Sequence, residues 1–148
     1  GLRVGWLASR SAAMIEAINT FKDYTTICGS ASGEILAIMA LRAKEAILSR
    51  NRVIIQNNLQ VLDAFFNKHS DLFNWQKPLG GTIGFPNLLL DRSVDNFCQQ
   101  LLVQKGVMLL PASVIGMQSN HFRIGFGRVN MPEVLNKLEE FLIENKYI

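Results

Sequence analysis

The sequence has little cysteine and little net charge, and both shortages exclude classes of protein. Only Cys28 and Cys98 occur among the 148 residues, far apart and with no histidine at ligand spacing. A disulfide framework and a structural zinc site are therefore not expected, and no metal site is predicted. The 15 basic and 12 acidic residues leave a net charge of +3 without any basic run. The charge pattern gives no reason to expect a nucleic-acid partner.

Long apolar runs and a signal pattern are also missing. No stretch approaches the roughly 18 to 20 apolar residues that cross a membrane, so no membrane partner is expected. Two separate cysteines and no leader favour a cytoplasmic location. The hydrophobic fraction of 49% and the mean hydropathy of +0.17 are sufficient for a core and exclude disorder. The apolar excess predicts surface that faces a further domain or a partner subunit, so self-association is expected.

The N-terminal segment Gly1–Ser9 is apolar apart from Arg3. It predicts a buried strand that is already under way at its first residue, as in a piece of a larger protein. An arginine buried without a partner costs several kcal/mol, so a buried Arg3 would be expected to hold an anion. From the residues alone, however, a terminal strand arginine is more often simply a solvated charge.

Two helices are predicted next, with serine caps. Ser11 can cap a short helix, and Ser30 or Ser32 can cap a long one that no proline interrupts before about Lys68. The first half of the long helix is apolar almost all round and is expected to be buried. The second half carries a single apolar stripe, formed by Ile55, Leu59, Leu62 and Phe66. A bend or break is expected at Ser49–Arg52.

The C-terminal half alternates short strand and helix patterns. Strands are expected over residues 72–76, 82–90, 107–110 and 121–126, the second of them irregular because it contains Gly84 and Pro86. Ser93 is expected to cap one helix, and Asn130 with Glu133 to cap the last. The predicted fold class is α/β: an α+β small domain with a three- to four-stranded sheet and helices, joined to the N-terminal residues by a long helix.

The stretch His121–Arg128 holds the candidate binding residue of this half. Alternation places Phe122, Ile124 and Phe126 on one face of a strand, and Arg123 with Gly125 on the other. Guanidinium forms two parallel charge-assisted hydrogen bonds to a carboxylate. From spacing alone, a small-anion site at Arg123 and an ordinary salt bridge are equally favoured. Arg128 is expected to pair with the Glu133 region, and neither His69 nor His121 is expected to be catalytic.

Four segments in order resemble one family. Gly1–Trp6, Gly80–Gly81 before a strand, Gly106–Pro111 and Phe122–Ile124 together resemble the C-terminal part of the fold-type-I, pyridoxal-phosphate-dependent aminotransferases of class I and II. The resemblance covers essentially the whole chain, and the long helix falls where the family links its two domains. It implies residues 1–48 as a remnant of the larger cofactor-binding domain, residues 49–71 as the linking helix and residues 72–148 as the small domain.

The resemblance also implies roles for single residues. Arg3 matches the arginine that pairs with the cofactor phosphate, Arg123 the arginine that clamps the substrate carboxylate, and Gly81 lies in the loop over the substrate. The Schiff-base lysine of the family would lie upstream of Gly1, so the chain contains no catalytic residue. The 148-residue chain alone is therefore expected to be inert and not to bind pyridoxal phosphate.

For the whole protein, the resemblance implies an aminotransferase of amino-acid metabolism. It would move an amino group between an amino acid and a 2-keto acid, and would act as a homodimer. Two alternatives remain open at this point. One is another pyridoxal-phosphate reaction on the same fold, such as that of a decarboxylase or a synthase. The other is a non-catalytic module that binds an amino acid or mediates dimerisation.

Overall fold

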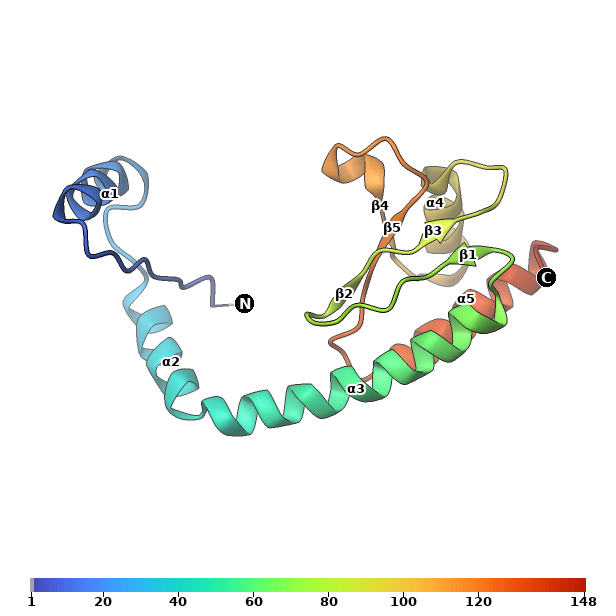
Figure 1. Cartoon of the computed structure of the whole chain (residues 1–148), viewed down its shortest axis with the longest axis horizontal. Helices are drawn as coiled ribbons and strands as arrows, with labels where there is room; N and C mark the ends of the chain where they lie inside the picture. Colours follow the sequence, from blue (N-terminus) through green and yellow to red (C-terminus); the bar gives the residue numbers. More distant parts are fainter. Residues whose placement is uncertain (1) are drawn as a thin grey trace. The chain divides into compact units, whose positions relative to one another are not determined.

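The computed structural model describes residues 2–148, which divide into two compact units between Ser49 and Arg50. The first unit holds the helices α1 (Ala12–Thr25) and α2 (Ala31–Arg42) (Figure 1). The helix α3 (Lys44–Lys68) begins in the first unit and continues into the second. The second unit contains all the strands and the remaining helices.

The N-terminal segment is not a strand. Gly1 lies outside the described residues, and residues 2–9 are irregular and exposed. The backbone of Arg3 has φ 55°, in the left-handed region, which interrupts extended structure. A strand also needs a neighbouring strand for its backbone hydrogen bonds, and the first unit has none within residues 2–49. The prediction of a buried strand was therefore wrong for this segment.

Both serine caps are confirmed, whereas the break in the long helix lies elsewhere. Ser11 Oγ accepts a hydrogen bond from the Met14 backbone N–H at 3.3 Å, and Ser30 Oγ accepts one from the Gly33 N–H at 3.2 Å. The helical run is interrupted at Ala43, six residues before the predicted break.

The first half of the long helix is not buried as predicted. The apolar side chains of α2 are about half exposed, namely those of Ile35, Leu36, Ile38, Met39 and Leu41. The reason is geometric, because a helix that is apolar all round cannot bury every side within a unit of two short helices and a segment of chain.

The single stripe on the later half of α3 is confirmed. Leu62 and Phe66 are fully buried, and Ile55 and Leu59 pack partly buried against the same core. The opposite side of the helix is exposed and mostly polar. This half of α3 therefore forms one wall of the second unit.

Two small antiparallel sheets form the centre of the second unit. The strands β1 (Phe73–Asn74) and β3 (Asn87–Leu88) pair with each other. The strand β5 (Phe122–Gly125) lies between β2 (Ile83–Gly84) and β4 (Leu110–Pro111). The irregular strand predicted for residues 82–90 is confirmed, because β2 and β3 are separated at Pro86, which has no backbone N–H to donate.

The helices of this unit follow the predicted order, with one cap corrected. The helix α4 (Val94–Lys105) is capped by Ser93 and ends at Gly106. The φ of 66° at Gly106 lies in the left-handed region, which favours glycine. A short 3₁₀ turn, η1 (Ala112–Ile115), follows β4. The last helix, α5 (Met131–Glu144), begins without a side-chain hydrogen bond from Asn130, so the predicted capping box is not formed.

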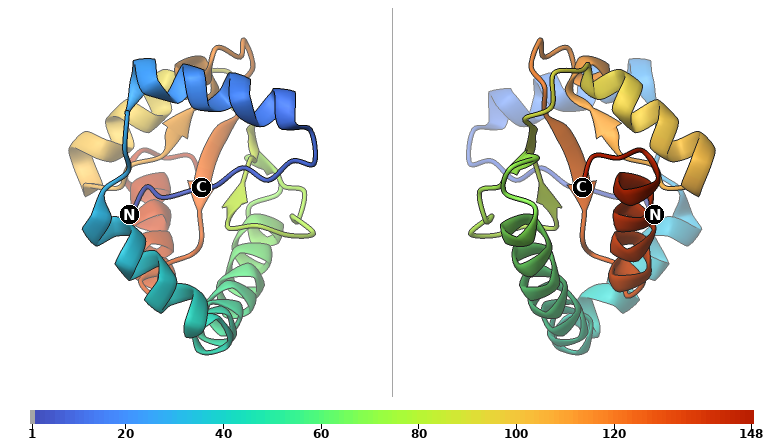
Figure 2. Two further views of the ribbon diagram at one scale, coloured as in Figure 1. Left: turned by 90° about the vertical axis from the view of Figure 1, so that its left-hand side faces the viewer. Right: turned by 90° about the vertical axis from the view of Figure 1, so that its right-hand side faces the viewer.

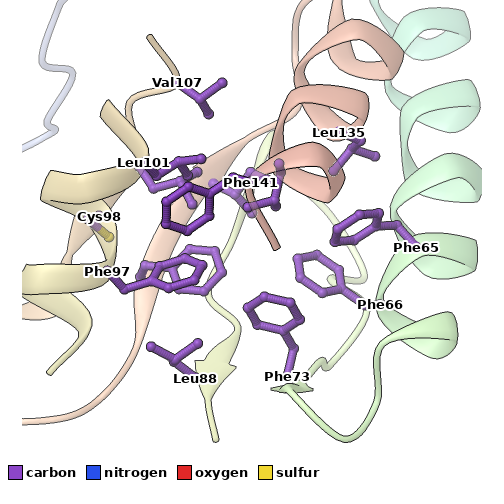
Figure 3. Close-up of a cluster of buried hydrophobic side chains, with 14 of the residues drawn as sticks. Phe65, Phe66, Phe73, Leu88, Phe97, Cys98, Leu101, Val107, Leu135 and Phe141 are labelled. Atoms are coloured by element: carbon purple, nitrogen blue, oxygen red, sulfur yellow. The ribbon is translucent and has the colours of Figure 1, made fainter. Parts of the chain in front are cut away.

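The core lies between the inner face of the sheet and three helices. The end-on views show the later half of α3, α4 and α5 arranged around β5 (Figure 2). Phenylalanine rings from these helices and from β1 converge there, and Phe73 contacts both Phe97 and Phe122 edge to face (Figure 3). Each fully buried ring or leucine contributes about 1.5–3 kcal/mol relative to an exposed one. The helices therefore hold the inner face of β5 fixed.

Candidate functional site

The strand β5 presents its polar residues on the face away from the core. Phe122 and Ile124 are buried, and Arg123 and Gly125 are exposed, as the alternation predicted. Within residues 2–148 the Arg123 side chain forms no ion pair or hydrogen bond. The expected alternative, a salt bridge at Arg123, is therefore not present in the described chain, and its guanidinium remains available for an external anion.

The neighbours of Arg123 follow from the strand register. Leu110 of β4 lies directly opposite Arg123 on one side. On the other side, Gly84 pairs with Ile124, and Asn87 bridges to His121 in the same register, which puts Phe85 opposite Arg123. The Phe122 N–H donates to the Pro86 carbonyl at 3.1 Å and holds this alignment. The register therefore places Arg123 between two apolar residues, Leu110 and Phe85.

Two amide side chains fix the ends of β5. The buried Asn58 of α3 donates from Nδ2 to the carbonyls of Phe126 at 2.8 Å and Arg128 at 2.6 Å. At the other end, Asn120 Nδ2 donates to the Leu88 carbonyl at 2.8 Å, and its Oδ1 accepts from the Val94 N–H at 2.8 Å. These bonds connect β5 to α3, β3 and α4, so the strand that carries Arg123 has a defined position.

The end of β5 that Asn58 holds also corrects a prediction. Arg128 was expected to pair with the Glu133 region, but Glu133 pairs with Lys137 at 3.0 Å instead. Arg128 contributes its backbone carbonyl to the bond with Asn58 rather than its charge. The pairing follows helix geometry, because Glu133 and Lys137 are four residues apart on one face of α5.

A groove of about 460 Å³ is lined by His121 and Phe85, the neighbours of Arg123 on this outer face, although Arg123 itself is not part of its lining. Its polar lining consists of Asn74, Gln76, Lys77, Asn87 and His121. Its apolar lining comes mainly from Pro78, Ile83 and Phe85. The volume lies within the range of small-molecule sites, about 300–1,000 Å³. No carboxylate lines it within the described part of the chain, so the groove favours groups that accept hydrogen bonds.

The lysine of this groove is held by α3. Lys77 Nζ forms an ion pair with Asp63 Oδ2, and Trp75 Nε1 donates to Asp63 Oδ1 at 2.7 Å. Burial raises the pKa of Asp63, but the hydrogen bonds from Lys77 and Trp75 outweigh it, so the pKa is lowered below its usual value. Asp63 therefore stays ionised and offsets the charge of Lys77.

Two glycines near the groove, Gly81 before β2 and Gly84 within it, are required for different reasons. Gly81 has φ 81°, a conformation that other residues adopt at a cost, and a Cβ there would meet no atom within 4 Å. A Cβ at Gly84 would come within 2.5 Å of the Trp75 ring. Gly84 is therefore required for packing and Gly81 for backbone shape. A role of Gly81 in binding substrate stays a prediction.

Arg3 belongs to the first unit. It is exposed, and it forms no ion pair with any residue in the range 2–148. The next residue, Val4, lies against the first turn of α2, with Cγ2 3.2 Å from the position of a Cβ on Gly33. An unpaired guanidinium has the donor chemistry that a phosphate group requires. A contact of Arg3 with the cofactor phosphate stays a prediction.

Most of the lysines have carboxylate partners. Five of the seven lysines form ion pairs with carboxylates, namely Lys44, Lys68, Lys77, Lys105 and Lys137. Both cysteines are free thiols, Cys28 exposed and Cys98 buried. Residues 2–148 contain no cluster of three or more histidine, cysteine or acidic side chains that could hold a metal ion. No helix in the described range has both the length and the apolarity to cross a membrane.

The sequence of the chain identifies its family. Residues 1–140 match the sequence model of aminotransferase class I and II. The chain belongs to this family. Members have fold type I and depend on pyridoxal phosphate, and the mixed α/β fold described above agrees with that membership.

Individual proteins similar to this chain agree with the assignment. A pyridoxal-phosphate-dependent aminotransferase from Streptococcus suis has 30% identity and a TM-score of 0.87, over 97% of this chain and 38% of that chain. A pyridoxal-phosphate-dependent cyclase, OrfR, has 27% identity and a TM-score of 0.86, over 98% of this chain and 40% of that chain. Capreomycidine synthase from Streptomyces vinaceus is 28% identical over 85% of this chain. The chain spans 32% of the length of that synthase.

Family resemblance and strand alternation pointed to Arg123, but they missed the residues around it. Asn58, Asn120 and the pair of Phe85 with His121 come together only through long-range pairing. Asn58 did carry a signal, because it is a polar residue within a buried helical stripe. The sequence also showed that His121 lies two residues before Arg123, but it did not show that Phe85 stacks on His121.

Proposed function

We propose that the protein containing this chain is a pyridoxal-phosphate-dependent aminotransferase that moves an amino group between an amino acid and a 2-keto acid. The observation that carries the proposal is the exposed Arg123 guanidinium, on a strand fixed at both ends, without a carboxylate partner among residues 2–148. A planar fork held in this way suits bidentate binding of a substrate carboxylate.

The residues of this chain would bind and orient. Arg3 would contact the phosphate of the cofactor, and Arg123 would hold the substrate carboxylate, with Gly81 in the loop beside it. Bound pyridoxal phosphate supplies the electron sink that makes chemistry at the substrate Cα possible. Phe85 and Leu110 on either side of Arg123 would exclude water and strengthen the ion pair with the carboxylate.

The 148-residue chain alone is proposed to be inactive and not to retain the cofactor. Five of its seven lysines pair with carboxylates, and none of the seven lies on the outer face of β5. The catalytic lysine would come from residues of the whole protein that this chain does not contain. The chain spans 32–40% of the three relatives' lengths, which leaves room for it. A homodimer in the cytoplasm is part of the same proposal.

A second candidate is a pyridoxal-phosphate reaction other than transamination. The observation in its favour is that two of the similar proteins are described as a synthase and a cyclase. The same arginine would serve either chemistry, because binding the carboxylate precedes both.

The deciding experiment supplies the whole protein with pyridoxal phosphate, an amino acid and a 2-keto acid. Amino transfer is followed as the appearance of the new amino acid by mass spectrometry, with the 148-residue chain as the control. Transfer by the whole protein and none by the chain is expected. A product of altered carbon skeleton without amino transfer would favour the second candidate, and no reaction with any amino acid would contradict both.

A further inference from the structure

We infer that His121 is a specificity-determining residue that receives an oxygen-bearing substrate side chain, such as a carboxylate or carboxamide, in the groove beside Arg123. The inference rests on the proposed function, because it takes the substrate carboxylate to be held at Arg123. It goes further in naming the class of side chain that the groove accepts and the atom that meets it.

The first step concerns position. His121 and Arg123 are two residues apart on β5, so both lie on the outer face, and their Cα atoms are separated by roughly 7 Å. His121 lines the groove of about 460 Å³ together with Phe85, which lies opposite Arg123. If the substrate carboxylate is held at Arg123, a substrate side chain of three or four atoms can therefore reach the groove.

The second step concerns orientation of the imidazole. The rings of Phe85 and His121 stack, with centroids 5.1 Å apart and planes 12° from parallel. The backbone of His121 is held by its bridge to Asn87. The preceding residue, Asn120, is held by hydrogen bonds from its side chain to the carbonyls of Leu88 and Arg92. The imidazole is therefore oriented by neighbours before any ligand arrives, which lowers the entropy cost of binding.

The third step identifies the available atom. Nδ1 of His121 is buried and has no hydrogen-bond partner among the described residues. An N–H enclosed there would be left unsatisfied at a cost, so the favoured tautomer has its proton on Nε2. Nε2 is the nitrogen that His121 can offer to the groove, and it offers a donor.

The fourth step concerns the character of the groove. Its other polar residues are the amides of Asn74, Gln76 and Asn87 and the ammonium of Lys77, whose charge is offset by Asp63. With no carboxylate in this lining, a cationic side chain would find no counter-ion. A carboxylate or carboxamide oxygen would find the Nε2–H donor and amide N–H groups, so the groove discriminates by hydrogen bonds rather than by size.

A binding experiment on the 148-residue chain tests this without any turnover. Its two histidines, His69 and His121, are followed by imidazole proton resonances, assigned with the His121→Phe variant. Glutarate is compared with pentanoate, which has the same length but lacks the second carboxylate. Glutarate is expected to shift His121 and leave His69 unchanged, because His69 is buried against Glu139. Equal shifts with both ligands, or no shift of His121, would overturn the inference.

A kinetic experiment on the whole protein adds the specificity. His121→Phe keeps a ring against Phe85 but removes both nitrogens, and Gln118→Ala on the preceding loop is the control. His121→Phe is expected to lower kcat/KM about tenfold for glutamate and glutamine and less than twofold for norvaline. An equal loss for all three amino acids would reduce His121 to a structural role. If the whole protein transfers no amino group, the proposed function fails, whereas the glutarate result still decides the inference.

Discussion

At the scale of single residues, the outer face of β5 combines exposure with a fixed position. Arg123 is exposed, yet the strand beneath it is held by amide hydrogen bonds from Asn58 and Asn120. An arginine that binds a ligand loses conformational entropy of its side chain and, where the backbone is mobile, of its backbone as well. Because β5 is already fixed, only the side-chain loss remains for Arg123. An exposed guanidinium on a fixed strand is what the proposed binding of a carboxylate at Arg123 requires.

Gly81 provides a test of backbone shape in the loop before β2. Gly81→Ala is expected to lower the free energy of unfolding by about 1 kcal/mol, because a side chain is disfavoured at φ 81°. Gly80→Ala is the matched control, since Gly80 has open space around it and no positive φ. Urea denaturation monitored by tryptophan fluorescence measures both. Equal stabilities of the two variants would contradict the role of Gly81 in the turn.

The two cysteines provide a test of the core. Burial, with a smaller contribution from Asp95, raises the pKa of the Cys98 thiol to about 12. It therefore holds about a thousandfold less thiolate at pH 8 than a thiol of ordinary pKa 9.0. Iodoacetamide at pH 8 is expected to label the exposed Cys28 in the folded chain and to spare Cys98 until urea is added. Mass spectrometry of Cys28→Ser is the control, and rapid labelling of Cys98 in that variant would contradict the packing.

At the scale of elements, a few polar bonds at the edge of the core connect α3 to the end of β5 and α5 to the end of α3. Asn58 connects α3 to the end of β5, and Glu139 of α5 meets Lys68 and His69 at the end of α3. The apolar stripe of α3 specifies which face is buried, the Asn58 bonds fix α3 against the end of β5, and the Glu139 bonds fix α5 against the end of α3.

Asn58→Ala is expected to lower the free energy of unfolding by about 1–3 kcal/mol. It leaves the carbonyls of Phe126 and Arg128 without their donor at a buried position. Asn57→Ala, one residue away and exposed, is the matched control, for which no comparable loss is expected. Hydrogen exchange of β5 amides would locate the effect. A loss in Asn57→Ala as large as that in Asn58→Ala would point to helix propensity instead.

Glu139 makes the junction of α3 and α5 dependent on pH. The hydrogen bond from Lys68, at 2.5 Å, lowers the pKa of Glu139 against the opposing effect of burial, and the bond from His69 lowers it further. A carboxyl whose folded pKa is depressed stabilises the fold above its unfolded pKa and loses that contribution as pH falls through the folded value.

Glu139→Gln is therefore expected to lower stability at pH 7 by up to about 1 kcal/mol. The difference from the unaltered chain should shrink as pH falls below the ordinary glutamate value of 4.5. Thermal unfolding between pH 3 and pH 7 measures it. The exposed pair of Glu133 with Lys137 supplies the control variant, Glu133→Gln, with a smaller effect. A difference that grows on acidification would contradict the assigned pairing.

Features set by neighbouring residues could be predicted, and features set by distant pairing could not. The caps at Ser11, Ser30 and Ser93 and the alternation of β5 were predictable because each depends on a few consecutive residues. The prediction of an N-terminal strand was wrong because a strand also needs a neighbouring strand for its backbone hydrogen bonds. The partners of His121 and Asn58 depend on how chain segments 34 and more residues away align, which no local pattern encodes.

At the scale of the whole molecule, the chain combines a well-packed second unit with a first unit whose apolar side chains are largely exposed. The second unit contains the core and the face that carries Arg123. The first unit contains Arg3 and the apolar surface of α2. The similar proteins are two to three times this length, and the proposed role of this chain within such a protein is to supply the anion-binding residues Arg3 and Arg123.

The central claim is that Arg123 holds the substrate carboxylate, and it is tested most directly by kcat/KM of the whole protein with an amino-acid substrate. Arg123→Lys keeps the charge but loses the planar fork. One charge-assisted hydrogen bond contributes about 1.5–3 kcal/mol, so kcat/KM is expected to fall at least about tenfold. Arg50→Lys, on the exposed side of α3, is expected to change it less than twofold. An Arg123→Lys protein that is folded and retains kcat/KM within twofold would contradict the account.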